Sequence, residues 1–378
     1  MNERPLDNAQ TSFTFMESED YLKRQIITYL GNKRALLPFL GRSIEKVRQR
    51  IGRTTLRLAD LFSGSGIVSR YFKQYASSLL VNDLESYAYV ISRCFLTNKT
   101  HVNWDELTDW HVQLQNRIEQ EWAPGPITEA YAPVDESCIT AQDRVFYTRR
   151  NAIFLDTARR VVGDIPEQIQ CLFLAPLLAE ATIHSNTSGV FKGFYKDRNG
   201  LGCYGGAGRN ALQRILGEVQ LQLPFLSNFE CPATIYQEDT NTLVEHMPEV
   251  DLAYLDPPYN QHPYGSNYFM LNLLVSGGKP RDLSRVSGIP AGWNRSRYNK
   301  RREVEEALFG VIQQCPARFL LISYNSEGFI SYSQFCDRLI KFGKLTTDVI
   351  PYNTFRGCRN LSARAQKVTE FLFLLEKA

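Results

Sequence analysis

The residues best suited to chemistry are Asp256-Pro257-Pro258-Tyr259, which directly follow the apolar run 250–255. A short apolar run bounded by turn residues predicts a buried strand, and the two prolines end it because neither can donate to a ladder. The loop then presents a carboxylate, the Pro257 carbonyl and an aromatic ring. The two acceptors could bind both hydrogens of a planar amine while Tyr259 stacks on the base. The alternative is a strand-ending turn with a buried tyrosine.

A glycine turn lies far upstream. Run 56–62 predicts a strand, and Ser63-Gly64-Ser65-Gly66 turns it into the helical run 67–75. Strand, glycine turn and helix are typical of sheets that bind adenosine-containing cofactors at their carboxyl edge, and Gly64 and Gly66 would let the backbone approach a ligand. Ser69 stands where a dinucleotide fingerprint has its third glycine, so S-adenosylmethionine, which has no phosphate, suits this turn better. A purely structural turn is the alternative.

An acidic residue stands at or after the end of each of three predicted strands. Asp83 follows run 78–81, about 20 residues beyond the glycine turn, where an acid can hold ribose hydroxyls. Its alternative role is to cap a helix that begins near Leu84. Asp60, at the end of the first strand, could accept a hydrogen bond from the cofactor's α-ammonium. Asp239 could bind the cofactor's adenine amino group or be a plain turn acid.

These motifs together resemble the Dam-like N6-adenine-specific DNA methyltransferases, including those of type II restriction–modification systems. The resemblance rests on Tyr29-Leu30-Gly31-Asn32-Lys33, then on residues 60–66, then on Asp256-Pro257-Pro258-Tyr259, in the alpha motif order. The acid that opens the last motif, where a serine could stand, is similar to the adenine branch.

The resemblance implies further site residues. It places Tyr29, Lys33 and Phe62 in the cofactor site, where Lys33 would neutralise the cofactor carboxylate or contact DNA near a flipped base. A surface lysine at a helix start is the alternative for Lys33.

Seven apolar, β-branched runs indicate an α/β fold. The resemblance implies a doubly wound, seven-stranded, mostly parallel methyltransferase sheet. The resemblance implies that the last strand inserts antiparallel beside its neighbour. We expect a flexible tail over 1–20, an S-adenosylmethionine-dependent catalytic domain over 21–100 and 232–378, and an inserted, largely helical target-recognition region over 101–231. The runs are 56–62, 78–81, 233–236, 251–255, 318–323, 345–350 and 368–375.

The insert is far longer than a crossover between strands requires. It has helical patches at 146–162 and 167–184, then a glycine-rich aromatic stretch at 188–196. Basic residues interleaved with aromatics can bind phosphates and stack bases, which makes Lys192 and Lys196 candidate DNA contacts. A packed glycine-rich loop is the alternative.

A second basic segment follows the catalytic loop. It could flank DNA entering the site, although such blocks are often solvated faces. Asn325, with Tyr324, ends the fifth strand at the same edge and is expected to line the base pocket; a helix cap is the alternative. The candidate phosphate contacts are Arg295, Arg297, Arg301 and Arg302.

Composition agrees with a soluble cytoplasmic enzyme. Among 378 residues, 43% are hydrophobic, and runs such as 171–178 are too short to span a bilayer. The first residues lack the apolar region of a signal peptide. Eight cysteines without a Cys-x-x-Cys pair indicate reduced thiols, with neither a zinc site nor a disulfide framework. The net charge of +3 does not by itself imply DNA.

The sequence therefore predicts a site-specific DNA adenine methyltransferase that uses S-adenosylmethionine, needs no metal and acts on double-stranded DNA. A companion restriction endonuclease would act separately. Two alternatives stay open at this point. One is an RNA adenine-N6 methyltransferase with the same pocket, and the other is a non-catalytic DNA-binding module.

Overall fold

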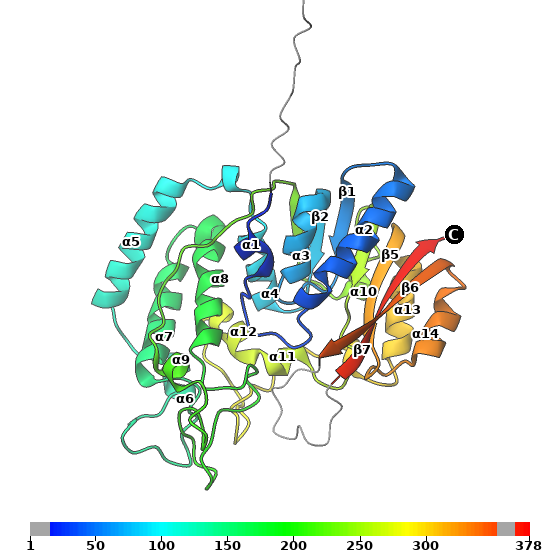
Figure 1. The fold of residues 1–378 in the computed structure, drawn as a ribbon. Helices are drawn as coiled ribbons and strands as arrows, with labels where there is room; N and C mark the ends of the chain where they lie inside the picture. Colours follow the sequence, from blue (N-terminus) through cyan, green and yellow to red (C-terminus); the bar gives the residue numbers. More distant parts are fainter. Residues whose placement is uncertain (1–15, 354–366) are drawn as a thin grey trace, which may run out of the picture.

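A seven-stranded sheet in the order β3-β2-β1-β4-β5-β7-β6 forms the centre of the part expected to be catalytic, residues 21–100 and 232–378 (Figure 1). The computed structural model describes residues 16–353 and 367–378. Each apolar run expected from the sequence forms one of these strands. They are β1 (Leu56–Asp60), β2 (Ala76–Asn82), β3 (Ala233–Tyr236), β4 (Val250–Leu255), β5 (Ala317–Asn325), β6 (Gly343–Asn353) and β7 (Lys367–Lys377).

The strand directions confirm a doubly wound, mostly parallel sheet. Strands β1 to β5 pair in parallel, whereas β7 lies between β5 and β6 and is antiparallel to both. The strand order reverses between β1 and β4, which is the switch point where open α/β sheets bind ligands. The sheet is therefore arranged to place a ligand beside the ends of β1, β2 and β4.

Helices cover both faces of the sheet. Strand β4 is buried along its whole length, as expected for a parallel strand covered on both sides. Leu252 and Tyr254 pack with helices α2 and α3, whereas Ala253 and Leu255 pack with α10, α13 and α14. The alternation along β4 thus divides the core into two layers. These helices are α2 (Leu37–Ile51), α3 (Ile67–Phe72), α10 (Thr240–Leu243), α13 (Val304–Gln314) and α14 (Tyr332–Leu339).

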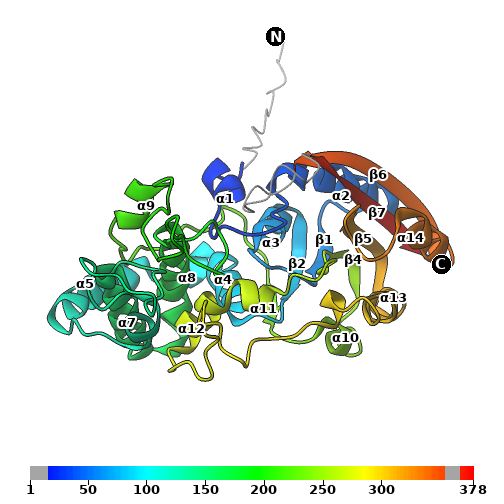
Figure 2. The ribbon, with the colours of Figure 1, turned by 90° about the horizontal axis from the view of Figure 1, so that it is seen from below.

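The insert lies beside the sheet, on the side away from β6 and β7 (Figures 1 and 2). The helical patches expected at 146–162 and 167–184 appear as α7 and α8. One apolar core runs from Tyr87 and Phe95 of α4 through Phe173 of α8 to Phe269 of α12. The insert therefore shares a core with the catalytic part. The helices here are α4 (Ser86–Phe95), α5 (Trp104–Gln120), α6 (Pro126–Tyr131), α7 (Arg149–Gly163), α8 (Glu167–Ile183), α9 (Leu212–Leu216) and α12 (Phe269–Ser276).

The start of the chain is ordered earlier than expected. Residues 1–15 of the predicted tail lie outside the described residues. Helix α1 (Glu19–Lys23) begins within residues 1–20, and the Glu17 carboxylate accepts from the backbone N–H of Asn228 at 2.9 Å. Tyr21 is buried and donates to the Phe95 carbonyl at 2.6 Å. Residues 16–20 of the expected tail thus contact the rest of the described structure, and the boundary at residue 20 stays a prediction.

Candidate active site

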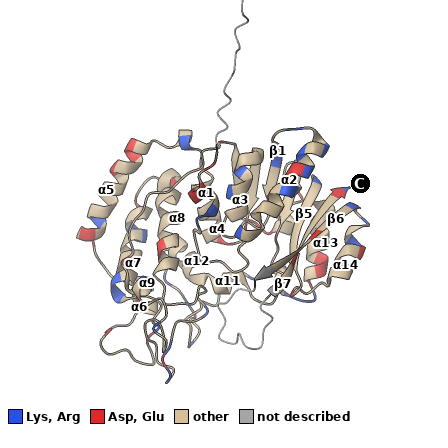
Figure 3. Ribbon diagram, in the orientation of Figure 1, with Lys and Arg blue, Asp and Glu red and all other residues tan. Residues whose placement is uncertain are grey.

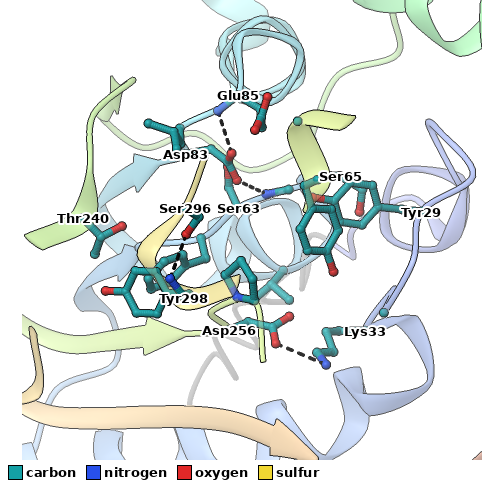
Figure 4. Close-up of a pocket in the computed structure, with 18 of the residues that line it drawn as sticks. Tyr29, Lys33, Ser63, Ser65, Asp83, Glu85, Thr240, Asp256, Ser296 and Tyr298 are labelled. Atoms are coloured by element: carbon teal, nitrogen blue, oxygen red, sulfur yellow. Dashed lines mark hydrogen bonds and ion pairs between the residues drawn. The ribbon is translucent and has the colours of Figure 1, made fainter. Parts of the chain in front are cut away.

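A pocket opens at the carboxyl edge of the sheet, beside the ends of β1, β2 and β4 (Figure 4). It is open to solvent, and about 830 Å³ of space free of protein atoms lies between its walls, part of it continuous with bulk solvent. Residues far apart in the chain therefore meet in one cavity. They come from the stretches 29–33, 62–68, 83–85, 239–240, 254–258, 264–265 and 294–299.

One carboxylate binds the glycine turn to the end of β2. Gly64 and Gly66 have φ of +51° and +73°, a region that glycine occupies readily. Asp83 accepts from the N–H of Gly64 at 2.7 Å and from the N–H of Glu85 at 2.9 Å, and burial raises the pKa of Asp83 to about 6. A Cβ on Gly64 would lie 2.7 Å from the Tyr29 ring. This position thus requires glycine for both conformation and space.

A second acid, Glu85, lines the pocket beside Asp83. The expectation that Asp83 caps the helix is wrong, because α4 begins at Ser86 and Glu85 occupies the N-cap position. The Glu85 carboxylate accepts from Asn272 at 2.5 Å and from Asn294 at 3.1 Å. Burial raises its pKa to about 7. In the sequence, its position two residues after Asp83 was the signal that could have identified Glu85 as a pocket residue.

The other two acids predicted to bind the cofactor are Asp60 and Asp239, and they differ in whether they reach the pocket. Asp60 is fully buried and does not line the pocket. Its Oδ2 accepts from Ser69 at 2.5 Å, its Oδ1 has no hydrogen-bond partner among the described residues, and burial raises its pKa to about 7. Asp239 does line the pocket, and it caps α10 by accepting from the N–H of Asn241 at 2.8 Å. Both interpretations of Asp239 thus remain compatible, whereas Asp60 lies behind the pocket surface.

The ammonium of Lys33 meets two carboxylates beside the catalytic loop (Figure 4). Its Nζ lies 3.2 Å from Asp256 Oδ1 and 3.4 Å from Glu370 Oε2. Only 3% of the Lys33 side chain is exposed, so the surface-lysine alternative is wrong. The Asn325 amide donates to the other oxygen of Glu370 at 3.4 Å. Sequence reasoning missed Glu370, which enters from β7 at the far end of the chain.

The charges in this cluster shift the pKa of Lys33 in the direction opposite to the effect of burial. Burial acts to lower the pKa of Lys33, but Asp256 and Glu370 outweigh it and hold that pKa well above its usual value. Burial also raises the pKa of Asp256 to about 6, with Lys33 lowering it and Glu370 raising it. The lysine is therefore a cation, and Asp256 is ionised above about pH 6.

The catalytic loop presents only part of its motif to the pocket. Asp256 and Pro258 line the pocket, whereas Pro257 is buried and Tyr259 is not part of the lining. The Tyr259 ring packs edge-on against Tyr324, with centroids 5.8 Å apart, and lies 5.6 Å from the Lys33 ammonium. Its stacking on a base thus stays a prediction.

Tyrosines after the catalytic loop fix the segment that carries Lys33. The Leu30 N–H donates to the Tyr268 hydroxyl at 2.7 Å, and the Tyr264 hydroxyl donates to the Leu30 carbonyl at 3.1 Å. The Tyr29 ring stacks on both tyrosines at 5.0 Å. The catalytic loop and the lysine segment are therefore held as one unit, through residues that no motif indicated.

The candidate DNA contacts occupy several environments. Lys192 is exposed and Lys196 half-buried, both in the irregular loops of the insert, where lysine and arginine gather at the lower edge in Figure 3. Arg295, Arg301 and Arg302 are exposed and Arg297 is half-buried. These positions are accessible to DNA, and their role in binding it stays a prediction.

Asn325 departs from its prediction. It is 4% exposed, is the last residue of β5 rather than a helix cap, and lies behind Glu370 instead of lining the pocket. Its side chain therefore contacts the Lys33 cluster through its hydrogen bond to Glu370.

Metal ligands and membrane spans were not expected from the sequence. Within residues 16–353 and 367–378, no group of three or more histidine, cysteine or acidic residues could hold a metal ion. No helix in the same ranges is long and apolar enough to cross a membrane.

The chain is similar to known DNA methyltransferases over most of its length. The family model described as D12 class N6 adenine-specific DNA methyltransferase matches residues 29–279. The type II methyltransferase M.CviAII of Paramecium bursaria Chlorella virus 1 is 28% identical, over 92% of this chain and 98% of its own length. M.NlaIII of Neisseria lactamica is 27% identical, over 93% and 99%. A crystal structure from Thermoplasma acidophilum covers 94% of this chain and 95% of its own, at 8% identity and a TM-score of 0.34.

Proposed function

This chain belongs to the D12 class N6 adenine-specific DNA methyltransferase family, and we propose that it delivers the methyl group of S-adenosylmethionine to an adenine flipped out of duplex DNA. One observation carries the proposal. The glycine turn held by Asp83 and the Lys33–Asp256 pair line the same pocket. A cofactor site and an amine acceptor are thus adjacent, as methyl transfer requires.

The pocket fits an adenosine-bearing cofactor. The rings of Phe62 and Tyr298, 5.1 Å apart and edge to face, offer apolar surface for a nucleobase. We assign Asp83 and Glu85 to the ribose hydroxyls and Asp239 to the adenine amino group. Lys33 is directed to Asp256 and Glu370, so we assign it to the catalytic pair rather than to the cofactor carboxylate.

Asp256 performs the central task. When bound, S-adenosylmethionine supplies an electrophilic methyl group on a sulfonium centre. The adenine amine is a poor nucleophile because its lone pair is delocalised into the ring. Asp256 and the Pro257 carbonyl would accept its two hydrogens, favour a tetrahedral nitrogen, and stabilise the positive charge that develops there. Lys33 holds Oδ1 of Asp256, so we assign the amine to Oδ2.

The same carboxylate can take up the departing proton. After transfer, the nitrogen carries one proton more than N6-methyladenine retains. Asp256 is ionised at neutral pH, since its pKa is about 6, and can accept this proton at Oδ2.

Access to the amine requires base flipping, because an adenine inside a duplex cannot reach a pocket at the sheet edge. We propose that Tyr259 stacks on the flipped base. We also propose that Lys192 and Lys196 of the inserted region 101–231 contribute to target recognition. The arginines after the catalytic loop would bind phosphates.

Sequencing of modified bases tests the proposal. The purified protein and S-adenosylmethionine are incubated with unmethylated genomic DNA, and N6-methyladenine is mapped, with Asp256→Ala as the inactive control. We expect methylation at one short sequence. A structured RNA is assayed in parallel, and equal activity on it would restore the RNA alternative. Absence of S-adenosylmethionine binding in calorimetry would favour the non-catalytic module.

The names of the relatives suggest a biological setting. Both M.CviAII and M.NlaIII are called type II methyltransferases. We propose that this enzyme acts in the cytoplasm and protects DNA from a separate companion restriction endonuclease. DNA that it has methylated should resist an endonuclease whose site contains the modified adenine, and unchanged cutting would contradict this role.

A further inference from the structure

The segment Asn294–Asn299 lies beyond residues 29–279, which the family model matches, yet it forms one wall of the pocket. Its residues alternate in direction. Asn294, Ser296 and Tyr298 line the pocket, whereas Arg295 and Arg297 do not. Residues Arg297–Asn299 form a 3₁₀ turn, and Asn299 also lines the pocket, so the segment has one face toward the pocket and another that carries the two arginines. The basic segment expected to bind DNA is thus also a wall of the cofactor site.

Hydrogen bonds fasten this wall at the cofactor end. The Asn294 amide donates to Glu85 Oε2 at 3.1 Å and to the Leu84 carbonyl at 3.2 Å. A Cβ on Gly265 would lie 2.6 Å from the Asn294 carbonyl oxygen, so the backbones approach closely. Asn294 therefore positions Glu85, the acid that we assign to the ribose.

Two more hydrogen bonds extend the wall. Tyr298 is 2% exposed, and its hydroxyl donates to Asn241 Oδ1 at 2.9 Å, beside the Asp239 cap. The Asn299 amide donates to the carbonyl of Asn260 at 2.7 Å, directly after the catalytic motif. The segment thus touches the ribose side, the adenine side and the catalytic loop.

The other face of the segment is cationic and faces solvent. Arg295 is exposed, with its guanidinium 4.4 Å from the Trp293 ring centre, and Arg297 is half-buried. Guanidinium groups suit DNA phosphates because they present several donors in a fixed plane. A phosphate bound there would restrict the segment whose opposite face lines the cofactor pocket.

From this arrangement we propose that Asn294, Ser296 and Tyr298 bind the cofactor while Arg295 and Arg297 bind DNA phosphates, so that each ligand strengthens the binding of the other. This inference rests on the proposed function. A ligand that holds one face of the segment fixes the position of the residues on its other face, and the coupling must be equal in both directions.

Calorimetry with S-adenosylhomocysteine, which cannot transfer a methyl group, tests the coupling. Its Kd is measured without DNA and with a saturating duplex that contains adenines. For the wild-type enzyme we expect tighter binding with DNA, by about 5- to 150-fold, the usual range for coupled sites. Arg295→Gln/Arg297→Gln should keep the Kd measured without DNA and lose most of the tightening. Tyr298→Phe should weaken binding several-fold even without DNA.

A matched control is Arg301→Gln/Arg302→Gln, since these exposed arginines lie just beyond the wall. This variant should need more DNA for saturation but keep the coupling. An equal wild-type Kd with and without saturating DNA, or full coupling in Arg295→Gln/Arg297→Gln, would overturn the inference. If no variant and no wild-type enzyme binds S-adenosylhomocysteine, the cofactor assignment itself fails. Normal methylation without coupling contradicts this inference alone.

Discussion

Lys33 Nζ and Asp256 Oδ1 lie 3.2 Å apart in a buried cluster, although one residue precedes the sheet and the other follows β4. Burial favours the neutral form of Asp256, and the ammonium opposes it. Glu370, 3.4 Å from the same ammonium, acts in the opposite sense and raises the pKa of Asp256. The ionisation of the proposed acceptor therefore depends on two neighbours with opposite effects.

The first prediction concerns the pH dependence of kcat/KM. Protonated Asp256 loses its acceptor, so activity should fall as pH drops below about 6. Lys33→Met removes a cation that lowers this pKa and should move the acid limb to higher pH. Glu370→Gln removes an anion that raises it and should move the limb to lower pH. Rates of tritiated methyl transfer between about pH 4.5 and pH 8 measure both shifts.

Lys33→Arg is the control for this pair, because it keeps the charge and should leave the acid limb near that of the wild type. Thermal unfolding of each variant checks that the fold persists. Shifts of Lys33→Met and Glu370→Gln in the same direction would show that this cluster does not set the ionisation of the catalytic acid.

The second prediction concerns Asp256 itself. Asp256→Ala should lower kcat by at least about 10²-fold, the usual cost of removing a group that stabilises transition-state charge. Asp256→Asn should retain slightly more activity, since its amide oxygen still accepts one hydrogen bond. Both should bind S-adenosylmethionine nearly as the wild type does, measured by calorimetry. Full turnover of Asp256→Ala at saturating DNA would refute the assignment.

The third prediction compares two glycines with positive φ. Gly64→Ala should weaken cofactor binding about tenfold or more, because its Cβ would lie 2.7 Å from the Tyr29 ring and force the pocket wall to move. Gly52→Ala is the matched control, with φ +76° and nothing within 4 Å. Gly52→Ala should lose about 1–2 kcal/mol of unfolding free energy from the positive φ alone, and Gly64→Ala should lose more because of its close contact with Tyr29. Equal cofactor Kd values in the two variants would mean that the turn does not bind cofactor.

The fourth prediction separates phosphate binding from base recognition. Arg301→Gln/Arg302→Gln should weaken binding to all duplexes alike and reduce the log–log salt slope by about 0.9 for each phosphate that is no longer neutralised. Lys192→Ala or Lys196→Ala should instead change which sites are methylated, by about 1–3 kcal/mol for each base that the side chain reads. Filter binding on target and scrambled duplexes across a salt series distinguishes them. Arginine variants that lose specificity at an unchanged slope would reverse these roles.

Much of the fold followed from local patterns. Apolar runs bounded by turn residues predicted the strands, most clearly the central strands β1, β4 and β5, where burial on both faces makes such runs continuous. The antiparallel placement of β7 came only from the family resemblance, since sheet order depends on interactions between distant segments. Helices α7 and α8 of the insert were also predicted, with α7 starting at Arg149 rather than at residue 146, whereas α5 was not.

The site was less predictable than the fold. Motifs indicated Asp256, Lys33 and Gly64, but nothing local shows that Glu370 would approach Lys33 across the sheet. The wall at Asn294–Asn299 did carry a signal, the alternation of polar residues with Arg295 and Arg297. The arginines of that stretch indicated DNA binding, so the polar residues between them were not predicted to line the pocket.

The core that joins Phe95 of α4, Phe173 of α8 and Phe269 of α12 bears on how new specificities could be engineered. Exchange of the whole insert with that of a relative would cut through this core, so a chimera would have to match both sides of the packing at once. Phe191 and Phe194 anchor the irregular loop in the same core. Variation confined to Lys192, to Lys196 and to the exposed positions around them would leave those anchors in place, so under the role proposed for this loop it is the part that could be exchanged between relatives.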